Sequence, residues 1–207
     1  MQESDGDVDR DSARGEADPS AIPWGDLMPD PLLMRWLAEH HCGCAEPGCR
    51  ALKIACGLGD DAEELARCGW RVTAIDGSET AIRWCCERFS GSSVEYVRAD
   101  LRDAPEEWDG AFRLVVDSHA YPAALLAQDP AVLRRTVNLL APGGTLLVIC
   151  RLREPTMGGA CVAALDEVTA RFSGLGLERV TLHEFVDPLD PAVRRGALEF
   201  RAPGGEE

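Results

Sequence analysis

One stretch constrains the fold more than any other: "ALKIACGLGDDAEELARCGWRVTAID", residues 51–76. An apolar strand pattern leads into a turn with two glycines, a helical pattern follows, and a second strand pattern ends at Asp76. Glycine permits a tight turn and leaves no side chain between backbone and ligand. The helix behind the turn presents free amide donors. The stretch therefore predicts a strand–helix–strand unit with a nucleotide-like ligand at its turn.

The rest of the chain continues this alternation until its last quarter. Further strand patterns lie at 94–100, 112–117 and 145–150, and helical patterns lie between them at 79–89 and 130–141. Alternation of this kind predicts a parallel sheet with helices on both faces. After a helical pattern within 159–176, two strand patterns at 177–187 and 192–202 are joined by a short link that contains Asp and Pro. Without a helix between them, these two strands are expected to form an antiparallel pair.

The N-terminal composition marks a domain boundary. Residues 1–19 carry seven acidic and two basic residues and almost nothing apolar, so burial cannot offset the entropy of ordering them. We expect an acidic disordered tail over 1–19 and a single domain over 20–207. The first helix is expected to begin at Asp30-Pro31, with the aspartate as N-cap and the proline at the first helical position.

The net charge bears on the class of ligand. The chain has a formal charge of -15, whereas binding to a nucleic-acid backbone needs a basic patch, so nucleic acid is not expected as partner or substrate. No stretch approaches the roughly 18 apolar residues of a membrane span, and no basic segment followed by an apolar one marks a secretory signal. A cytoplasmic protein, monomeric or weakly dimeric, is the expectation.

The nine cysteines raise the question of a metal site. Several, such as Cys56, Cys86 and Cys150, lie in apolar strand or helix patterns, where a free cysteine behaves as a small buried hydrophobe. The segment "HHCGCAEPGC", His40 to Cys49, groups thiols and imidazoles. Its Cys-x-Cys-x4-Cys spacing lacks the second, separated half of the usual zinc patterns. We expect no metal there.

Two cofactors compete for the glycine turn. Gly57, Gly59 and Ala62 match the dinucleotide fingerprint, in which the turn binds the pyrophosphate of NAD. Asp60 and Asp61 on the same turn would repel a pyrophosphate but suit a ligand with a positive amino group, which favours S-adenosylmethionine. Asp76 suits the ribose of either cofactor, or simply ends its strand in a turn.

From about Ile22 to Ala202 the chain resembles the class I S-adenosylmethionine-dependent methyltransferases. The resemblance is carried by "ACGLGDDAEELA", "VTAID", "VRADLRD", "LVVDSHAY" and "LLAPGGTLLVI". It implies a Rossmann-like seven-stranded sheet, mostly parallel, in the order 3-2-1-4-5-7-6 with strand 7 antiparallel and helices on both faces. It also implies S-adenosylmethionine as cofactor and a methyltransferase activity.

The same resemblance implies roles for individual residues. Gly57 and Gly59 would approach the methionyl part of the cofactor, and Asp76 would bind its ribose. The remaining residues expected to line the cofactor pocket are Ala55, Asp60, Gly77, Ser78, Asp100 and Leu101 (beside adenine), Asp117 (beside the transferring methyl) and Ser118.

The sequence departs from the family pattern at two positions of this stretch. Lys53 stands where the family has an acidic residue, and Ala55 where it has the first glycine of the turn. An unpaired buried lysine would be costly. Asp60 or Asp61 is therefore expected either to replace the lost carboxylate or to neutralise Lys53.

The methyl acceptor is the least constrained part of the prediction. Methyl transfer from a sulfonium is an in-line displacement in which a thiol or amine needs little base assistance and a hydroxyl needs more. Candidate catalytic residues lie at the end of the fourth strand and just after it: His119, Asp117 and Tyr121, although His119 can also simply cap the strand end or line a loop.

The N-terminal segment also bears on the acceptor site. It resembles the thiopurine/thiol branch of small-molecule methyltransferases, which implies a lid formed by Trp24 and Met28, with Tyr121 as a pocket wall. Trp24 can alternatively pin the chain to the first helix. The expected function is methyl transfer to a small thiol, amine or heterocycle. A non-catalytic cofactor-binding protein and an NAD-linked oxidoreductase are the alternatives.

Overall fold

The computed structural model describes residues 27–40, 49–118, 130–152, 162–163, 165–186 and 194–205. Within these residues the strands are β1 (Arg50–Ile54), β2 (Arg71–Asp76), β3 (Glu95–Arg98), β4 (Phe112–Ser118), β5 (Leu140–Leu152), β6 (Val162–Ala163), β7 (Glu178–Val186) and β8 (Arg194–Arg201). The helices are α1 (Pro31–Glu39), α2 (Asp60–Arg67), α3 (Glu79–Arg88), α5 (Pro130–Asn138) and α6 (Leu165–Gly174), with short 3-10 turns η3 (Leu101–Asp103) and η4 (Glu106–Trp108).

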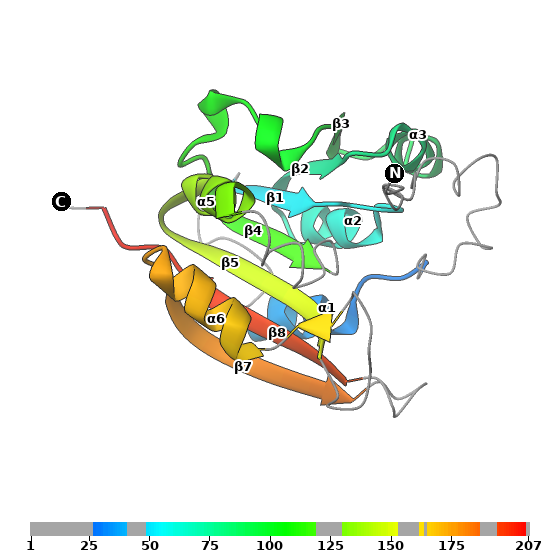
Figure 1. Ribbon diagram of the computed structural model, residues 1–207. Helices are drawn as coiled ribbons and strands as arrows, with labels where there is room; N and C mark the ends of the chain where they lie inside the picture. Colours follow the sequence, from blue (N-terminus) through cyan, green and yellow to red (C-terminus); the bar gives the residue numbers. More distant parts are fainter. Residues whose placement is uncertain are drawn as a thin grey trace, which may run out of the picture.

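The strands form one sheet in the order β3-β2-β1-β4-β5-β8-β7, with the two-residue β6 paired to the end of β5 (Figure 1). Strands β1 to β5 run parallel to one another. Strand β8 is antiparallel to both β5 and β7. Strands β7 and β8 occupy the places of the predicted strands 6 and 7, so the predicted topology is confirmed.

Helices cover both faces of this sheet. Helices α5 and α6 pack on one face, where they share an apolar core with alternate residues of β1, β4 and β8, such as Leu52, Val115 and Phe200. Helices α1, α2 and α3 share the core of the opposite face with Ala51 and Leu114. Figure 1 shows α5 and α6 in front of the sheet and α1 and α2 behind it. The alternation of buried residues between the two faces follows from the period of two of a strand.

The predicted helix starts are confirmed in detail. Asp30 is the N-cap of α1, its carboxylate accepts a hydrogen bond from the Leu32 amide, and Pro31 occupies the first turn. The Ser78 hydroxyl caps α3 by accepting from the Ala81 amide. Each contact satisfies an amide that the first helical turn leaves without an internal partner.

One predicted helix boundary is wrong, and one short strand was not predicted. The helical pattern at 130–141 ends at Asn138, because Leu140 already pairs with Phe112 as the first residue of β5. The helix predicted within 159–176 is α6, Leu165–Gly174, but Val162 and Ala163 pair with the end of β5 as the unpredicted strand β6. In both places pairing with the sheet prevails over local helical periodicity.

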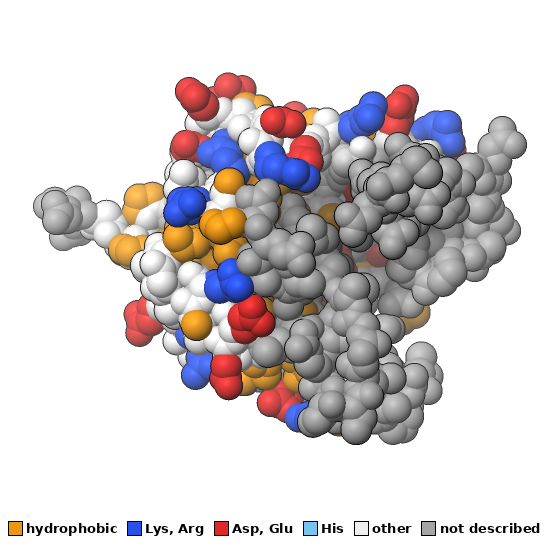
Figure 2. All heavy atoms as spheres, in the orientation of Figure 1, with side chains coloured by type: hydrophobic (Ala, Val, Ile, Leu, Met, Phe, Trp, Pro, Cys, Tyr) orange, Lys and Arg blue, Asp and Glu red, His pale blue; other side chains and the backbone are white. Residues whose placement is uncertain are grey.

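The predicted acidic tail, residues 1–19, lies outside the described residues, and the predicted single domain stays a prediction. None of the helices in the described ranges is long and apolar enough to span a membrane. On the face shown in Figure 2, acidic and basic side chains are interspersed over the described surface, without a basic patch there.

Candidate active site

The predicted glycine turn lies at the carboxyl edge of the sheet. Strand β1 is parallel to β2 and β4, with Ile54 opposite Ile75 and Asp117, so the ends of all three strands meet at one edge. The turn itself is built from residues with left-handed backbone angles: φ is 43° at Ala55, 55° at Gly57 and 93° at Gly59. Ligands of open parallel sheets bind at this edge, beyond the carboxyl ends of the strands.

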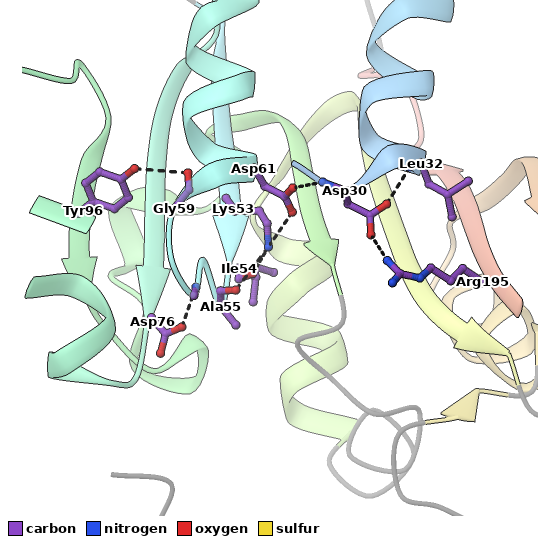
Figure 3. Close-up of polar contacts among 11 residues, drawn as sticks. Asp30, Leu32, Lys53, Ile54, Ala55, Gly59, Asp61, Asp76, Tyr96 and Arg195 are labelled. Carbon is purple, nitrogen blue, oxygen red and sulfur yellow. Dashed lines mark hydrogen bonds and ion pairs between the residues drawn. The ribbon is translucent and has the colours of Figure 1, made fainter. Parts of the chain in front are cut away.

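Asp76 spans the turn from the end of β2. Its Oδ2 accepts a hydrogen bond from the Gly57 amide at 3.1 Å (Figure 3). Its Oδ1 accepts one from the Ser78 amide at 2.8 Å. The side chain is buried. A carboxylate has about four acceptor positions, and the amides of Gly57 and Ser78 occupy two of those of Asp76. Asp76 therefore fixes the turn at the edge of the sheet where a ligand would bind.

Gly59 lies where no larger residue fits. A Cβ built on it would lie 2.7 Å from Tyr96 Oη, 3.0 Å from Cys85 Sγ and 3.1 Å from Phe89 Cε2. The Tyr96 hydroxyl donates to Glu63 (2.7 Å) and is held in place by it. Burial, followed by this contact with Glu63, raises the pKa of Tyr96, which keeps the phenol protonated. The sequence indicated the glycine but not the side chains packed against it.

Asp60 is bound by an arginine that the sequence analysis missed. The Arg88 guanidinium donates to both carboxylate oxygens of Asp60 at 2.9 Å and also to the carbonyl of Leu58. The hydrogen bonds from Arg88 to Asp60 raise the pKa of Arg88. This two-point contact fastens the end of α3 to the start of α2. No local sequence signal links residues 28 positions apart, and the cofactor role of Asp60 remains a prediction.

Lys53 is buried and its charge is neutralised by Asp61. Its side chain is among the largest fully buried in the described part of the chain, and its Nζ lies 3.8 Å from Asp61 Oδ2. The same Nζ donates to the carbonyls of Ile54 (2.8 Å) and Ala55 (3.4 Å). Of the two aspartates considered from sequence, Asp61 faces Lys53 and Asp60 faces Arg88 (Figure 3 shows the first pair).

Asp61 also connects the turn to the first helix. Its Oδ1 accepts a hydrogen bond from the Asp30 amide at 2.8 Å. The Asp30 carboxylate in turn accepts from Arg195 of β8 at 3.1 Å, and both side chains are buried. A continuous polar chain thus runs from β1 through α2 and α1 to β8 (Figure 3).

The end of β4 carries two of the predicted site residues. Asp117 is 4% exposed. Burial of the Cys150 thiol is the main cause that raises the pKa of Cys150 to about 12, and the charge of Asp117 is the second. The hydroxyl oxygen of Ser118 is buried and has no hydrogen-bond partner among the described residues. A buried hydroxyl without a partner is unfavourable unless a ligand satisfies it. Ser118 thus provides a fit for a polar cofactor at this edge.

Asp100 and Leu101 lie just beyond β3, at the same edge. Asp100 caps η3 by accepting from the Arg102 amide at 2.9 Å, and Leu101 is buried. Burial acts to raise the pKa of the Asp100 carboxyl, but the hydrogen bonds from Arg102 outweigh it and lower that pKa. Gly77 continues the chain from Asp76, and a Cβ added to it would meet nothing within 4 Å.

Other predicted residues lie outside the description. Trp24, His119 and Tyr121 are outside the described residues, as are residues 41–48 of the cysteine–histidine segment. At its ends, His40 stacks on Trp36 and Cys49 is disulfide-bonded. Met28, the second predicted lid residue, is 70% exposed and lies three residues before the first residue of α1.

The sequence analysis also did not predict that two buried thiols, those of Cys56 and Cys85, lie together beside the turn. Cys85 of α3 donates to the carbonyl of Gly57 at 3.3 Å. A hydrogen bond with Cys85, followed by burial, raises the pKa of Cys56 far above its ordinary value. Both thiols therefore pack against the turn, and the raised pKa keeps Cys56 there as a neutral group.

Comparison with known proteins agrees with this geometry. Residues 51–144 match the family model described as "Methyltransferase domain". The ubiquinone biosynthesis O-methyltransferase of Xanthomonas campestris pv. campestris is 32% identical over 168 residues, 78% of this chain and 67% of that relative. A probable phthiotriol/phenolphthiotriol dimycocerosates methyltransferase of Mycobacterium ulcerans is 32% identical over 165 residues, 77% of this chain and 57% of that relative.

Solved structures share the fold. One, described as the conversion of a disulfide bond into a thioacetal group during echinomycin biosynthesis, superposes with a TM-score of 0.73 at 20% identity, over 95% of this chain and 91% of that one. The N-methyltransferase NodS of Bradyrhizobium japonicum, in complex with S-adenosyl-L-homocysteine, gives 0.64 at 23% identity, over 83% and 84% of the two chains. The chain belongs to the class I S-adenosylmethionine-dependent methyltransferases, and S-adenosylmethionine is its cofactor.

Proposed function

We propose that this methyltransferase transfers the methyl group to a hydroxyl of a small, phenol-like acceptor, with the cofactor held at the glycine turn by Gly57, Gly59 and Asp76. The observation that carries the placement is the Asp76 carboxylate, which two backbone amides fix at the end of β2, beside the glycine turn and at the edge where parallel sheets bind ligands. The choice of a hydroxyl is supported by the O-methyltransferase relatives at 32% identity. The sequence predicted small thiols, amines or heterocycles as acceptors, and the experiment below compares these with phenols.

Each residue has a definite task in this proposal. Bound S-adenosylmethionine supplies a methyl group activated on a sulfonium. Asp76 accepts hydrogen bonds from the ribose hydroxyls and so sets the position of the cofactor along the edge. Ser118 gains the partner that its buried hydroxyl lacks among the described residues. Asp100 and Leu101 border the adenine, and Ala55, Asp60, Gly77 and Ser78 line the pocket as parts of the turn or of its neighbours.

Catalysis then depends on orientation and on proton removal. An in-line displacement needs the acceptor oxygen close to the methyl and aligned with the bond that breaks, which binding in a preformed pocket provides. The hydroxyl proton must leave as the new bond forms. Asp117, a buried carboxylate at the end of β4, receives this proton, with His119 and Tyr121 as the further candidates that follow it in the chain. Trp24 and Met28 would cover the acceptor side.

The first part of the test is cofactor binding. Calorimetry of the full chain with S-adenosylhomocysteine should give micromolar binding, and Asp76→Ala should weaken it at least about tenfold, as expected for loss of charge-assisted hydrogen bonds. Asp166→Ala, an exposed carboxylate on α6, is the matched control and should leave the affinity unchanged. Unaltered affinity in Asp76→Ala would refute the placement of the ribose.

The second part identifies the acceptor. Transfer of a radiolabelled methyl group should be measured across phenols and catechols, thiols, and amines including heterocyclic ones. The proposal expects labelled phenols, with transfer rising as pH increases toward deprotonation of the acceptor. Labelling confined to thiols or amines would refute the choice of a hydroxyl and leave the cofactor site intact.

A further inference from the structure

Ala55 is the unusual residue of the glycine turn. Its φ of 43° is the one positive value at a non-glycine residue in the described part of the chain. A Cβ makes this left-handed conformation unfavourable, whereas glycine adopts it freely. The turn thus contains a strained residue between the end of β1 and the glycines that are to meet the cofactor. Something in the fold must hold it there.

The Lys53 ammonium makes the contacts that would hold Ala55 in this conformation. It donates to the carbonyl before Ala55, that of Ile54, at 2.8 Å and to the carbonyl of Ala55 itself at 3.4 Å. In an extended chain successive carbonyls point to opposite sides, while helical angles of either hand bring them to the same side. A single cation that binds both carbonyls therefore favours helical angles at the residue between them. At Ala55 these are left-handed.

The fold holds the Lys53 side chain in place. Lys53 lies in β1, between β2 and β4, and is 1% exposed, so water does not compete for its donors. Asp61 lies 3.8 Å from Nζ and balances the charge. The Asp30 amide fixes Asp61 in turn, at 2.8 Å. The ammonium thus faces the carbonyl oxygens of Ile54 and Ala55 and one carboxylate oxygen of Asp61 (Figure 3).

We propose that Lys53 is a positioning residue for the cofactor turn: its ammonium, with Asp61 as counter-ion, holds Ala55 in the left-handed conformation that the turn requires. Lys53 and Ala55 are then a compensating pair. A glycine at position 55 needs no such clamp, and an alanine does. The inference rests on the proposed placement of the cofactor at this turn.

A double-substitution cycle tests the pair. The affinity of the full chain for S-adenosylhomocysteine is measured by calorimetry in wild type, Lys53→Met, Ala55→Gly and the double variant. Removing the ammonium lets Ala55 leave the left-handed region, so the fraction of competent turns falls and the apparent dissociation constant rises by about tenfold. In the Ala55→Gly background the same change should cost about twofold or less, because glycine retains the conformation unaided.

The control separates this effect from general loss of stability. Glu199→Gln removes another buried charge, on β8. Its effect on the free energy of unfolding in urea should be the same in wild type and in the Ala55→Gly variant, because position 55 does not act on Glu199. If Lys53→Met alone does not fold, the double variant must fold and bind. A double variant that also fails, or a Lys53→Met effect of equal size in both backgrounds, overturns the inference. Wild type that does not bind S-adenosylhomocysteine would instead refute the proposed cofactor site.

Discussion

Substitution of Gly59 by alanine separates two costs that a glycine turn avoids. The first is the backbone: at φ 93° a Cβ is disfavoured by about 1–2 kcal/mol, offset by about 0.4–1 kcal/mol of lost unfolded-state entropy. The second is steric, since the new Cβ would lie 2.7 Å from Tyr96 Oη. Tyr96 cannot simply swing away because its hydroxyl donates to Glu63 at 2.7 Å. Overpacking of this kind adds about 1–3 kcal/mol.

Gly69 is the matched control, because it has nearly the same backbone angle, φ 90°, and nothing within 4 Å of its added Cβ. Gly69→Ala should therefore destabilise by about 1 kcal/mol, and Gly59→Ala by roughly 2–4 kcal/mol. Urea unfolding followed by circular dichroism gives both values, with an unchanged slope m. Adding Tyr96→Phe, which removes the nearest atom, should recover part of the Gly59→Ala loss. Equal losses at the two glycines would refute the steric argument.

Two further predictions concern buried groups away from the turn. Glu199→Ala should destabilise the protein by about 2–3 kcal/mol, because it leaves the buried Trp36 indole N–H, 3.0 Å from Glu199 Oε2, without its acceptor. The exposed Glu184→Ala, measured by the same urea titration, should cost less than about 1 kcal/mol, and equal costs would contradict the role of burial. Iodoacetamide at pH 8 should alkylate the exposed Cys86 in the native protein but not Cys150, because burial and the charge of Asp117 raise the pKa of Cys150 to about 12. Peptide mapping by mass spectrometry reads this out, and native alkylation of Cys150 would contradict its burial.

The features predicted correctly from sequence are those with a local cause. The Asp30-Pro31 start of α1 and the Ser78 cap of α3 depend on side chains within three residues of the amides they satisfy. The sheet order followed from the alternation of strands and helices together with the family resemblance. The carboxyl-edge position of Asp76 follows from its place at the end of β2.

The features that escaped prediction depend on distant partners. Sequence could state that Lys53 needs a counter-ion, but only packing of α2 on β1 decides that Asp61 provides it and that Asp60 turns to Arg88. The short strand β6 was not predicted because the pairing of Val162 with β5 is a tertiary contact that a helical period cannot reveal. Such contacts are set by the whole fold and not by spacing along the chain.

The contacts between α1 and β8 also have a consequence for the order of folding. The ion pair of Asp30 with Arg195 and the hydrogen bond of Trp36 with Glu199 join residues 165 and 163 positions apart. Closing loops of this length is slow, and it requires almost the whole domain to have left the ribosome. Helix α1 is thus synthesised first among the described elements but can reach its native site only after β8 has entered the sheet between β5 and β7. Until then its apolar face, Leu33 and Leu37 included, has no β8 surface to cover it.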